Sequence, residues 1–155
     1  MQAAELELYE DAITLWNRYL ELTPDAVVAL FNKGFALMRL ERFSEALDIS
    51  RRVLDIEPFH KEAAFNYGVC ALYSGNLNDA VNRLEPLLRK YADHPPLLAV
   101  LSVLHLAAGG RKDADVYLQH LKRMNYSIAD FIAGRVGVLR RIGRNEYADA
   151  VEQSS

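Results

Sequence analysis

The sequence has few of the features that identify common function classes, beginning with cysteine. Its 155 residues include one cysteine, Cys70, so no disulfide can close within the chain and the fold does not need an oxidising compartment. The formal net charge is −3, whereas a dedicated nucleic-acid-binding protein normally carries a basic excess. No apolar run approaches the roughly 20 residues that cross a bilayer. We therefore expect no nucleic-acid partner and no transmembrane segment.

The same absences bear on the compartment. The amino-terminal residues lack the basic-then-apolar pattern of a signal peptide, and this predicts a cytoplasmic protein. Removal of a signal peptide from a longer precursor would leave the same sequence, so a periplasmic or secreted location stays open as the alternative.

Motifs for catalysis and for metal binding are also missing. The sequence has no HExxH helix, no Gly-rich phosphate loop followed by Lys and Ser or Thr, and no GxSxG turn. The histidines His60, His94, His105 and His120 are scattered, with no carboxylate or cysteine cluster at ligand spacing. His105 and Cys70 are expected to be packing residues inside helices. We therefore expect no enzyme, no metal site and no cofactor.

What the sequence does contain is an internal repeat of 34 residues. Alanine recurs at this interval at Ala12, Ala46, Ala80, Ala114 and Ala148. A second series, of mostly small residues, keeps the same step at Gly34, Gly68, Ser102 and Val136. Small side chains let two helices cross closely, so we expect Gly34 to face Ala46 and Gly68 to face Ala80.

Helical periodicity fills the segments between the turn residues. Apolar residues recur at steps of three and four, and the alternation typical of strands is absent. Proline, glycine and asparagine mark the breaks. The pattern predicts about nine helices, near 3–22, 26–40, 44–56, 60–74, 77–91, 96–108, 111–124, 128–142 and 145–153. Pro86 lies inside one of these segments, so we expect a kink or a break near Leu84 and Glu85.

The apolar positions of these helices predict the core. The side chains expected to fill it are Leu30, Leu37, Val53, Ala64, Tyr67, Leu84, Leu87, Leu98, Leu101, Leu118 and Leu121.

This pattern resembles the tetratricopeptide repeat family. The resemblance is carried by Leu30, Lys33, Gly34 and Leu37, followed by Ala46 and Pro58, and it covers nearly the whole chain. It implies an all-α fold, an α-α superhelix or solenoid of helix-turn-helix repeats, and a non-catalytic scaffold for protein–protein interaction. The implied organisation is a single domain, 1–155, with a partial repeat 1–24, repeats 27–60, 61–94 and 95–128, and an incomplete repeat 129–155.

In that family the leading helix of each repeat lines a concave groove that takes an extended peptide or a helix. The matching positions here are Val28, Phe31, Asn32, Phe35, Arg39, Glu62, Phe65, Asn66, Val69, Tyr73, Val100 and Val103. Members that hold acidic tails use Lys, Arg and Asn in the groove, whereas Phe31, Phe35 and Phe65 stand here. We therefore expect a protein partner with an apolar segment or an amphipathic helix, with Asn32 and Asn66 bonding its backbone.

The two ends of the chain differ in charge, and this leaves alternatives open. Residues 1–25 carry six acids and one base, whereas residues 110–144 carry eight bases and three acids. Ile13, Trp16 and Tyr19 belong to a first repeat that lacks most of its leading helix, so we expect these side chains to have no complete partner within the chain. One alternative is a self-assembling structural scaffold, a homo-oligomer joined through its oppositely charged ends. The other is an accessory domain of a larger enzyme.

Overall fold

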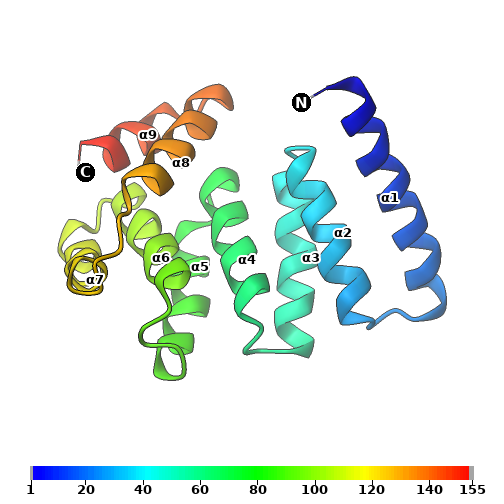
Figure 1. Ribbon diagram of the computed structural model, residues 1–155, viewed down its shortest axis with the longest axis horizontal. Helices are drawn as coiled ribbons and strands as arrows, with labels where there is room; N and C mark the ends of the chain where they lie inside the picture. The colour runs from blue at the N-terminus through cyan, green and yellow to red at the C-terminus, as the bar shows by residue number, and fades with distance from the viewer. Residues whose placement is uncertain (1, 154–155) are drawn as a thin grey trace. The chain divides into compact units, whose positions relative to one another are not determined.

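The computed structural model describes residues 2–153 and contains, within them, nine α-helices and one 3-10 helix but no strand (Figure 1). They are α1 (Ala3–Leu22), α2 (Val27–Arg39), α3 (Phe43–Ile56), α4 (Lys61–Ser74), α5 (Leu77–Leu84), η1 (Glu85–Arg89), α6 (Pro95–Ala107), α7 (Arg111–Arg123), α8 (Ala129–Arg141) and α9 (Asn145–Glu152). The all-α prediction is confirmed. The outer ends of the first and last predicted repeats, residues 1 and 154–155, lie outside the described residues.

The helices begin at intervals of 34 residues. Four of them, α2, α4, α6 and α8, begin at Val27, Lys61, Pro95 and Ala129, and their partners begin at Phe43, Leu77, Arg111 and Asn145. The period of the sequence is therefore the period of a structural unit made of two helices joined by a short turn.

The turn inside each helix pair has the same backbone conformation. Its φ is positive at Glu41 (57°), Gly75 (83°), Gly109 (80°) and Gly143 (80°), again at 34-residue steps. The N–H of the next residue donates to the carbonyl oxygen five residues earlier, as from Arg42 to Leu37 at 2.9 Å. This bond satisfies a carbonyl that the helix end leaves open, and glycine adopts the left-handed conformation without a steric penalty.

Replacing Gly75 by alanine should destabilise the protein more than the same replacement at Gly109. The left-handed backbone costs an L-residue roughly 1–2 kcal/mol at either position. A Cβ on Gly75 would also lie 3.1 Å from Nη1 of Arg144, whereas nothing lies within 4 Å of the same atom on Gly109. Arg144 is held in place because its Nη2 donates to the Ser74 carbonyl oxygen at 3.1 Å. Urea unfolding followed by circular dichroism gives the free energy of unfolding of both variants. Equal losses would show that the Arg144 side chain moves aside without an energetic cost.

The chain divides into two compact units, Met1–Cys70 and Ala71–Ser155, with the boundary inside α4. In the first unit α1 packs on α2, and α2 packs on α3. A Cβ added to Gly34 would lie 3.2 Å from Cγ2 of Ile49 and 3.8 Å from Oγ of Ser50. The close approach of α2 and α3 at Gly34 is therefore present, but the facing residues are Ile49 and Ser50. The predicted contact between Gly34 and Ala46 stays a prediction.

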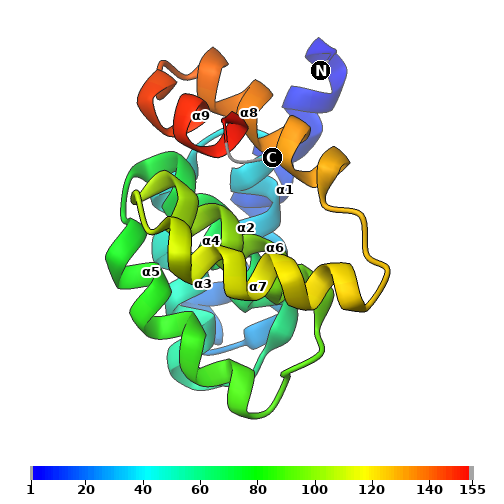
Figure 2. The same cartoon turned by 90° about the vertical axis from the view of Figure 1, so that its left-hand side faces the viewer.

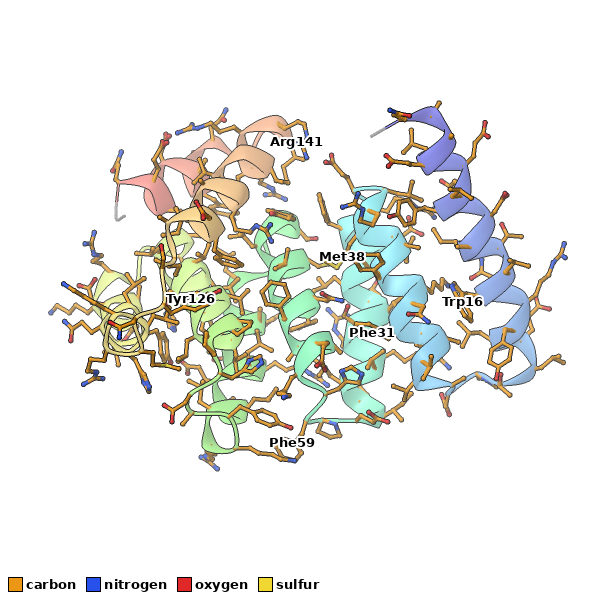
Figure 3. The ribbon with its side chains drawn as sticks, in the orientation of Figure 1. Trp16, Phe31, Met38, Phe59, Tyr126 and Arg141 are labelled. Carbon is orange, nitrogen blue, oxygen red and sulfur yellow. The ribbon has the colours of Figure 1, made fainter. Side chains whose placement is uncertain are left out.

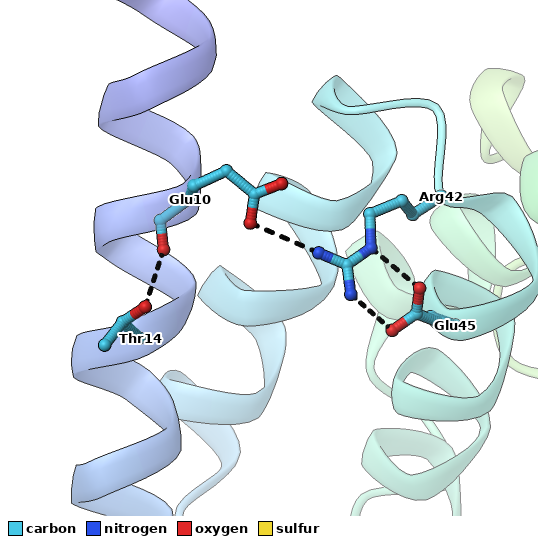
Figure 4. Close-up of polar contacts among 4 residues, drawn as sticks. All are labelled: Glu10, Thr14, Arg42 and Glu45. Atoms are coloured by element: carbon cyan, nitrogen blue, oxygen red, sulfur yellow. Dashed lines mark hydrogen bonds and ion pairs between the residues drawn. The ribbon is translucent and has the colours of Figure 1, made fainter.

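Arg42 connects three segments of the first unit at its surface (Figure 4). Its Nη1 donates to Glu10 of α1 at 3.3 Å, and its Nε and Nη2 donate to the two carboxylate oxygens of Glu45 of α3, both at 2.7 Å. The hydrogen bond from Arg42 lowers the pKa of Glu45 from its ordinary value. Because these groups are largely exposed, the contacts fix geometry more than they add stability.

The second unit is built around α6, which packs against α5, α7 and α9, while α8 packs against α9 (Figure 2). Its side chains are buried on every face, with half-buried His105 as the exception between Leu97 and Ala107. The hydroxyl of Ser102 is fully buried and donates to the Leu98 carbonyl oxygen at 2.7 Å. A helix that is apolar all round is an interior helix.

The break predicted at Pro86 is confirmed. The α-helix α5 ends at Leu84, and the chain continues as the 3-10 helix η1 from Glu85 to Arg89. Proline has no N–H to donate, and its ring clashes with the preceding turn, so the α-helical pattern stops there. Leu84 and Leu87, on either side of the break, both remain buried.

The predicted core is largely present. All of the side chains expected to be buried are buried except Leu118, which is half-buried on α7. None of the helices among residues 2–153 combines the length and the apolar character that a membrane crossing requires.

Candidate functional site

Helix α2 carries an exposed stripe formed by residues predicted to line a groove. Val28 and Phe35 are 72% and 48% exposed, respectively, and Arg39 is also exposed. Phe31 and Asn32 are half-buried on the same stripe, and Figure 3 labels Phe31 on α2. Steps of three and four residues place these side chains on one side of the helix.

Ring contacts extend this stripe onto α1. The Tyr9 ring lies 6.5 Å from that of Phe35 in an edge-to-face arrangement, and the Arg39 guanidinium lies 5.6 Å from the Tyr9 centroid. Tyr9 was not predicted, because family groove positions were assigned to the leading helices only. Its spacing from Ile13 and Trp16 places it on the side of α1 that faces α2, and this spacing was the available signal.

His60 extends the stripe at the start of α4. Its ring stacks on Phe31 with centroids 5.2 Å apart and an interplanar angle of 25°. Its Nδ1 accepts a hydrogen bond from the Ala63 N–H at 3.2 Å, so this nitrogen caps the start of the helix. We call Tyr9, Phe31, Phe35 and His60, together with Arg39, the aromatic face.

The structure separates the remaining predicted groove residues into two sets. Glu62 is exposed and Phe65 is half-buried, both on α4. The other side chains are buried, so the prediction that they line an open surface was wrong for Asn66, Val69, Tyr73, Val100 and Val103.

A part-buried polar network joins η1, α6 and α7. His105 Nε2 lies 3.0 Å from Glu85 Oε1, and the Tyr117 hydroxyl donates to the same oxygen at 2.8 Å. Burial, with the hydrogen bond to Glu85, raises the pKa of Tyr117 above its ordinary value, so the phenol stays a neutral donor. The network ties the segment that follows the Pro86 break to its neighbours. His105 is a partly buried packing residue, as predicted.

The isolated thiol and the scattered histidines assemble no reactive centre in the described part of the chain. Burial raises the pKa of the Cys70 thiol to about 12, which keeps it protonated and unreactive. Across residues 2–153, no group of three or more His, Cys, Asp or Glu side chains is placed to hold a metal ion.

The basic residues near the carboxyl end are largely engaged within the second unit. Arg140 pairs with Asp149 at 3.0 Å and also with Glu152. The guanidinium of Arg135 lies 5.1 Å from the Phe131 ring centroid and 5.8 Å from that of Tyr73. Arg135 and Arg140 therefore have structural roles within the second unit.

A shallow apolar hollow lies where α7 turns into α8, and no sequence pattern predicted it. It has an accessible volume of about 490 Å³ and is lined by Leu118, Leu121, Lys122, Asn125, Tyr126, Ser127, Ile128 and Ile132. Its lining includes Leu118, the predicted core residue that the structure leaves half-buried.

Comparison with known families is decisive for the fold. Two sequence profiles of the tetratricopeptide repeat match the chain, one over residues 2–61 and the other over residues 37–104. The chain belongs to the tetratricopeptide repeat (TPR) family. Members are scaffolds for protein–protein interaction and are generally non-catalytic adaptors.

Solved TPR structures resemble this TPR protein over most of its length. PilW, described as a widely conserved type IV pilus biogenesis factor, matches with a TM-score of 0.63 and 25% sequence identity. That match covers 89% of this chain but only 64% of PilW. TTC0263, a thermophilic TPR protein in Thermus thermophilus, matches with a TM-score of 0.60 at 20% identity, covering 94% of this chain and 81% of that one. No curated protein sequence matches the chain.

Proposed function

We infer that this TPR protein is an adaptor that binds an apolar peptide or an amphipathic helix of a partner protein on the aromatic face. The observation that carries the proposal is the exposure of Phe35 and Val28 beside the rings of Tyr9 and Phe31. Apolar side chains at i, i+3 and i+7 form a surface that complements the apolar side of a partner helix. Burying such rings against a partner releases water and favours binding.

Polar groups around the aromatic face support a peptide rather than a small molecule as the ligand. Asn32 lies among the apolar side chains of α2 and offers an amide to the backbone of a bound chain. Arg39 and Glu62 are exposed and carry opposite charges, so they favour a partner segment with an acidic and a basic flank.

Replacing Phe31 and Phe35 together by alanine tests this proposal. Partner recovery in a pull-down from native extract should fall by about 30-fold, the effect expected when an aromatic hot spot is removed. Helicity should be retained because neither ring is fully buried. The matched control is Val116→Ala, at an exposed apolar position on α7. Recovery of the same partners by the double variant, quantified by mass spectrometry, would refute the aromatic face as the site.

The head-to-tail scaffold receives less support. The basic tract that would meet the acidic amino-terminal segment is partly neutralised, since Arg140 pairs with Asp149 and Glu152, and Arg111 pairs with Asp115 at 3.0 Å.

The buried, protonated Cys70 needs no oxidising compartment, which supports a cytoplasmic location.

A further inference from the structure

Helix α1 has a second apolar surface, separate from the aromatic face. Leu8, Leu15 and Leu22 recur every seven residues and are 67%, 63% and 85% exposed, respectively, and Tyr19 beside them is 51% exposed. A seven-residue step is two helical turns, so these side chains form one line along the helix. We call Leu8, Leu15, Tyr19 and Leu22 the leucine stripe.

The leucine stripe is not the face by which α1 joins its own unit. Ile13 is buried and Trp16 is half-buried, and Trp16 lies between α1 and α2 (Figure 3). The expectation that Ile13 and Trp16 lack a partner is thereby corrected, because α2 covers that side of α1. Tyr19 remains exposed, as expected.

The repeat itself shows what the leucine stripe is shaped to contact. Adding one 34-residue period to Leu15 and Tyr19 gives Ile49 and Val53 of α3. Ile49 lies against Gly34 of α2, and Val53 is fully buried. In the complete repeat these positions form the surface on which another helix packs, whereas on α1 they are open. Among residues 2–153, the stripe is therefore a helix-packing surface that no helix covers.

We propose that the leucine stripe pairs with the same stripe of a second copy of the chain, the two α1 helices running antiparallel about Leu15. The stripe is complementary to itself under a twofold rotation: Leu8 of one copy then faces Leu22 of the other, and the two Leu15 side chains meet. Antiparallel helices joined by a regular seven-residue apolar line are a stable packing arrangement.

Charge complementarity identifies a second copy as the occupant. Asp11 and Arg18 lie four residues before and three residues after Leu15, along one edge of the leucine stripe. Both are exposed, and within residues 2–153 neither side chain forms a hydrogen bond or an ion pair. Antiparallel pairing about Leu15 brings Asp11 of each copy next to Arg18 of the other. Glu7 lies one turn before Asp11 on the same edge, whereas Glu10 and Glu21 lie farther round α1 from the leucine stripe.

Sedimentation equilibrium of the full chain tests the pairing. The unmodified protein should run as a dimer of the 17.5 kDa chain, and Leu15→Glu should raise its dissociation constant at least about 100-fold because two like charges meet at the twofold axis. Val116→Glu, at a comparably exposed apolar position on α7, should remain dimeric. Circular dichroism should show native helicity in both variants, since both side chains are exposed.

The charges at the edge provide the sharper test. Asp11→Arg and Arg18→Asp should each weaken self-association alone, because each places like charges opposite one another. An equimolar mixture of the two variants should recover a dimer, because every edge contact between unlike copies then joins an arginine to an aspartate. A monomeric unmodified protein at about 100 µM would overturn the proposal, and the stripe would then take a helix of another protein. A dimer that is insensitive to Leu15→Glu, or a mixture that stays monomeric, would overturn it equally.

Discussion

Replacing Val103 by aspartate should abolish the native fold of the second unit. Val103 lies on α6 and is fully buried, so its replacement puts a carboxylate in an apolar interior. An unpaired buried charge costs more than about 4 kcal/mol, a large part of the 5–15 kcal/mol that typically separates folded from unfolded states. Loss of helical circular dichroism and of protease resistance would show the effect.

The matched control is Phe35→Asp, which changes the same position of the repeat two periods earlier. Phe35 is 48% exposed, so the new carboxylate stays in water and only the contact with Tyr9 is lost. We expect a loss of about 1 kcal/mol in the free energy of unfolding. A folded Val103→Asp protein of similar stability would mean that α6 has an open face after all.

Replacing Leu98 by alanine should lower the free energy of unfolding by about 2–5 kcal/mol. Leu98 packs with Ala99 and Leu121, and the half-buried side chains of Leu88, Tyr117, Met124, Ile128 and Phe131 surround this cluster. The cluster joins α6, α7, η1 and α8, so truncation leaves a cavity that no single helix can close by shifting. Urea unfolding monitored by circular dichroism gives the value.

Val116→Ala on α7 is the control for this truncation. Its side chain is 62% exposed, and substitutions at such sites usually change stability by less than about 0.5 kcal/mol. A Leu98→Ala loss as small as that of Val116→Ala would show that the cluster collapses around the missing atoms.

The sequence predicted the features that depend on local chemistry. Helix boundaries follow from turn residues and apolar steps, and all nine predicted segments are helical over most of their predicted lengths. The end of α5 at Leu84 follows from Pro86, which has no N–H to donate and clashes with the preceding turn. Such features were predictable because each is decided by a few neighbouring residues.

Features decided by long-range packing were predicted less well. The repeat pattern gives Phe35 and Val103 the same position, yet one is exposed and the other buried, because the period fixes the side of a helix and not what covers it. The sequence did contain a signal that α6 is buried on every face, because Ser102 and His105 are the only polar side chains of this helix after its two prolines. Tyr9 was missed because groove positions were assigned to the leading helices only, although its spacing on α1 was a signal. His60 was missed because its ring contact with Phe31 leaves no trace in spacing.

The constant spacing of helix starts has a consequence for how such a chain can change length. From Val27 onward, the helix starts and the left-handed residues inside the helix pairs recur every 34 residues, as Glu41, Gly75 and Gly109 show. Excising or duplicating one segment between two of these turns therefore joins backbone of matching conformation. Cut at these turns, the chain can change its length by whole repeat units.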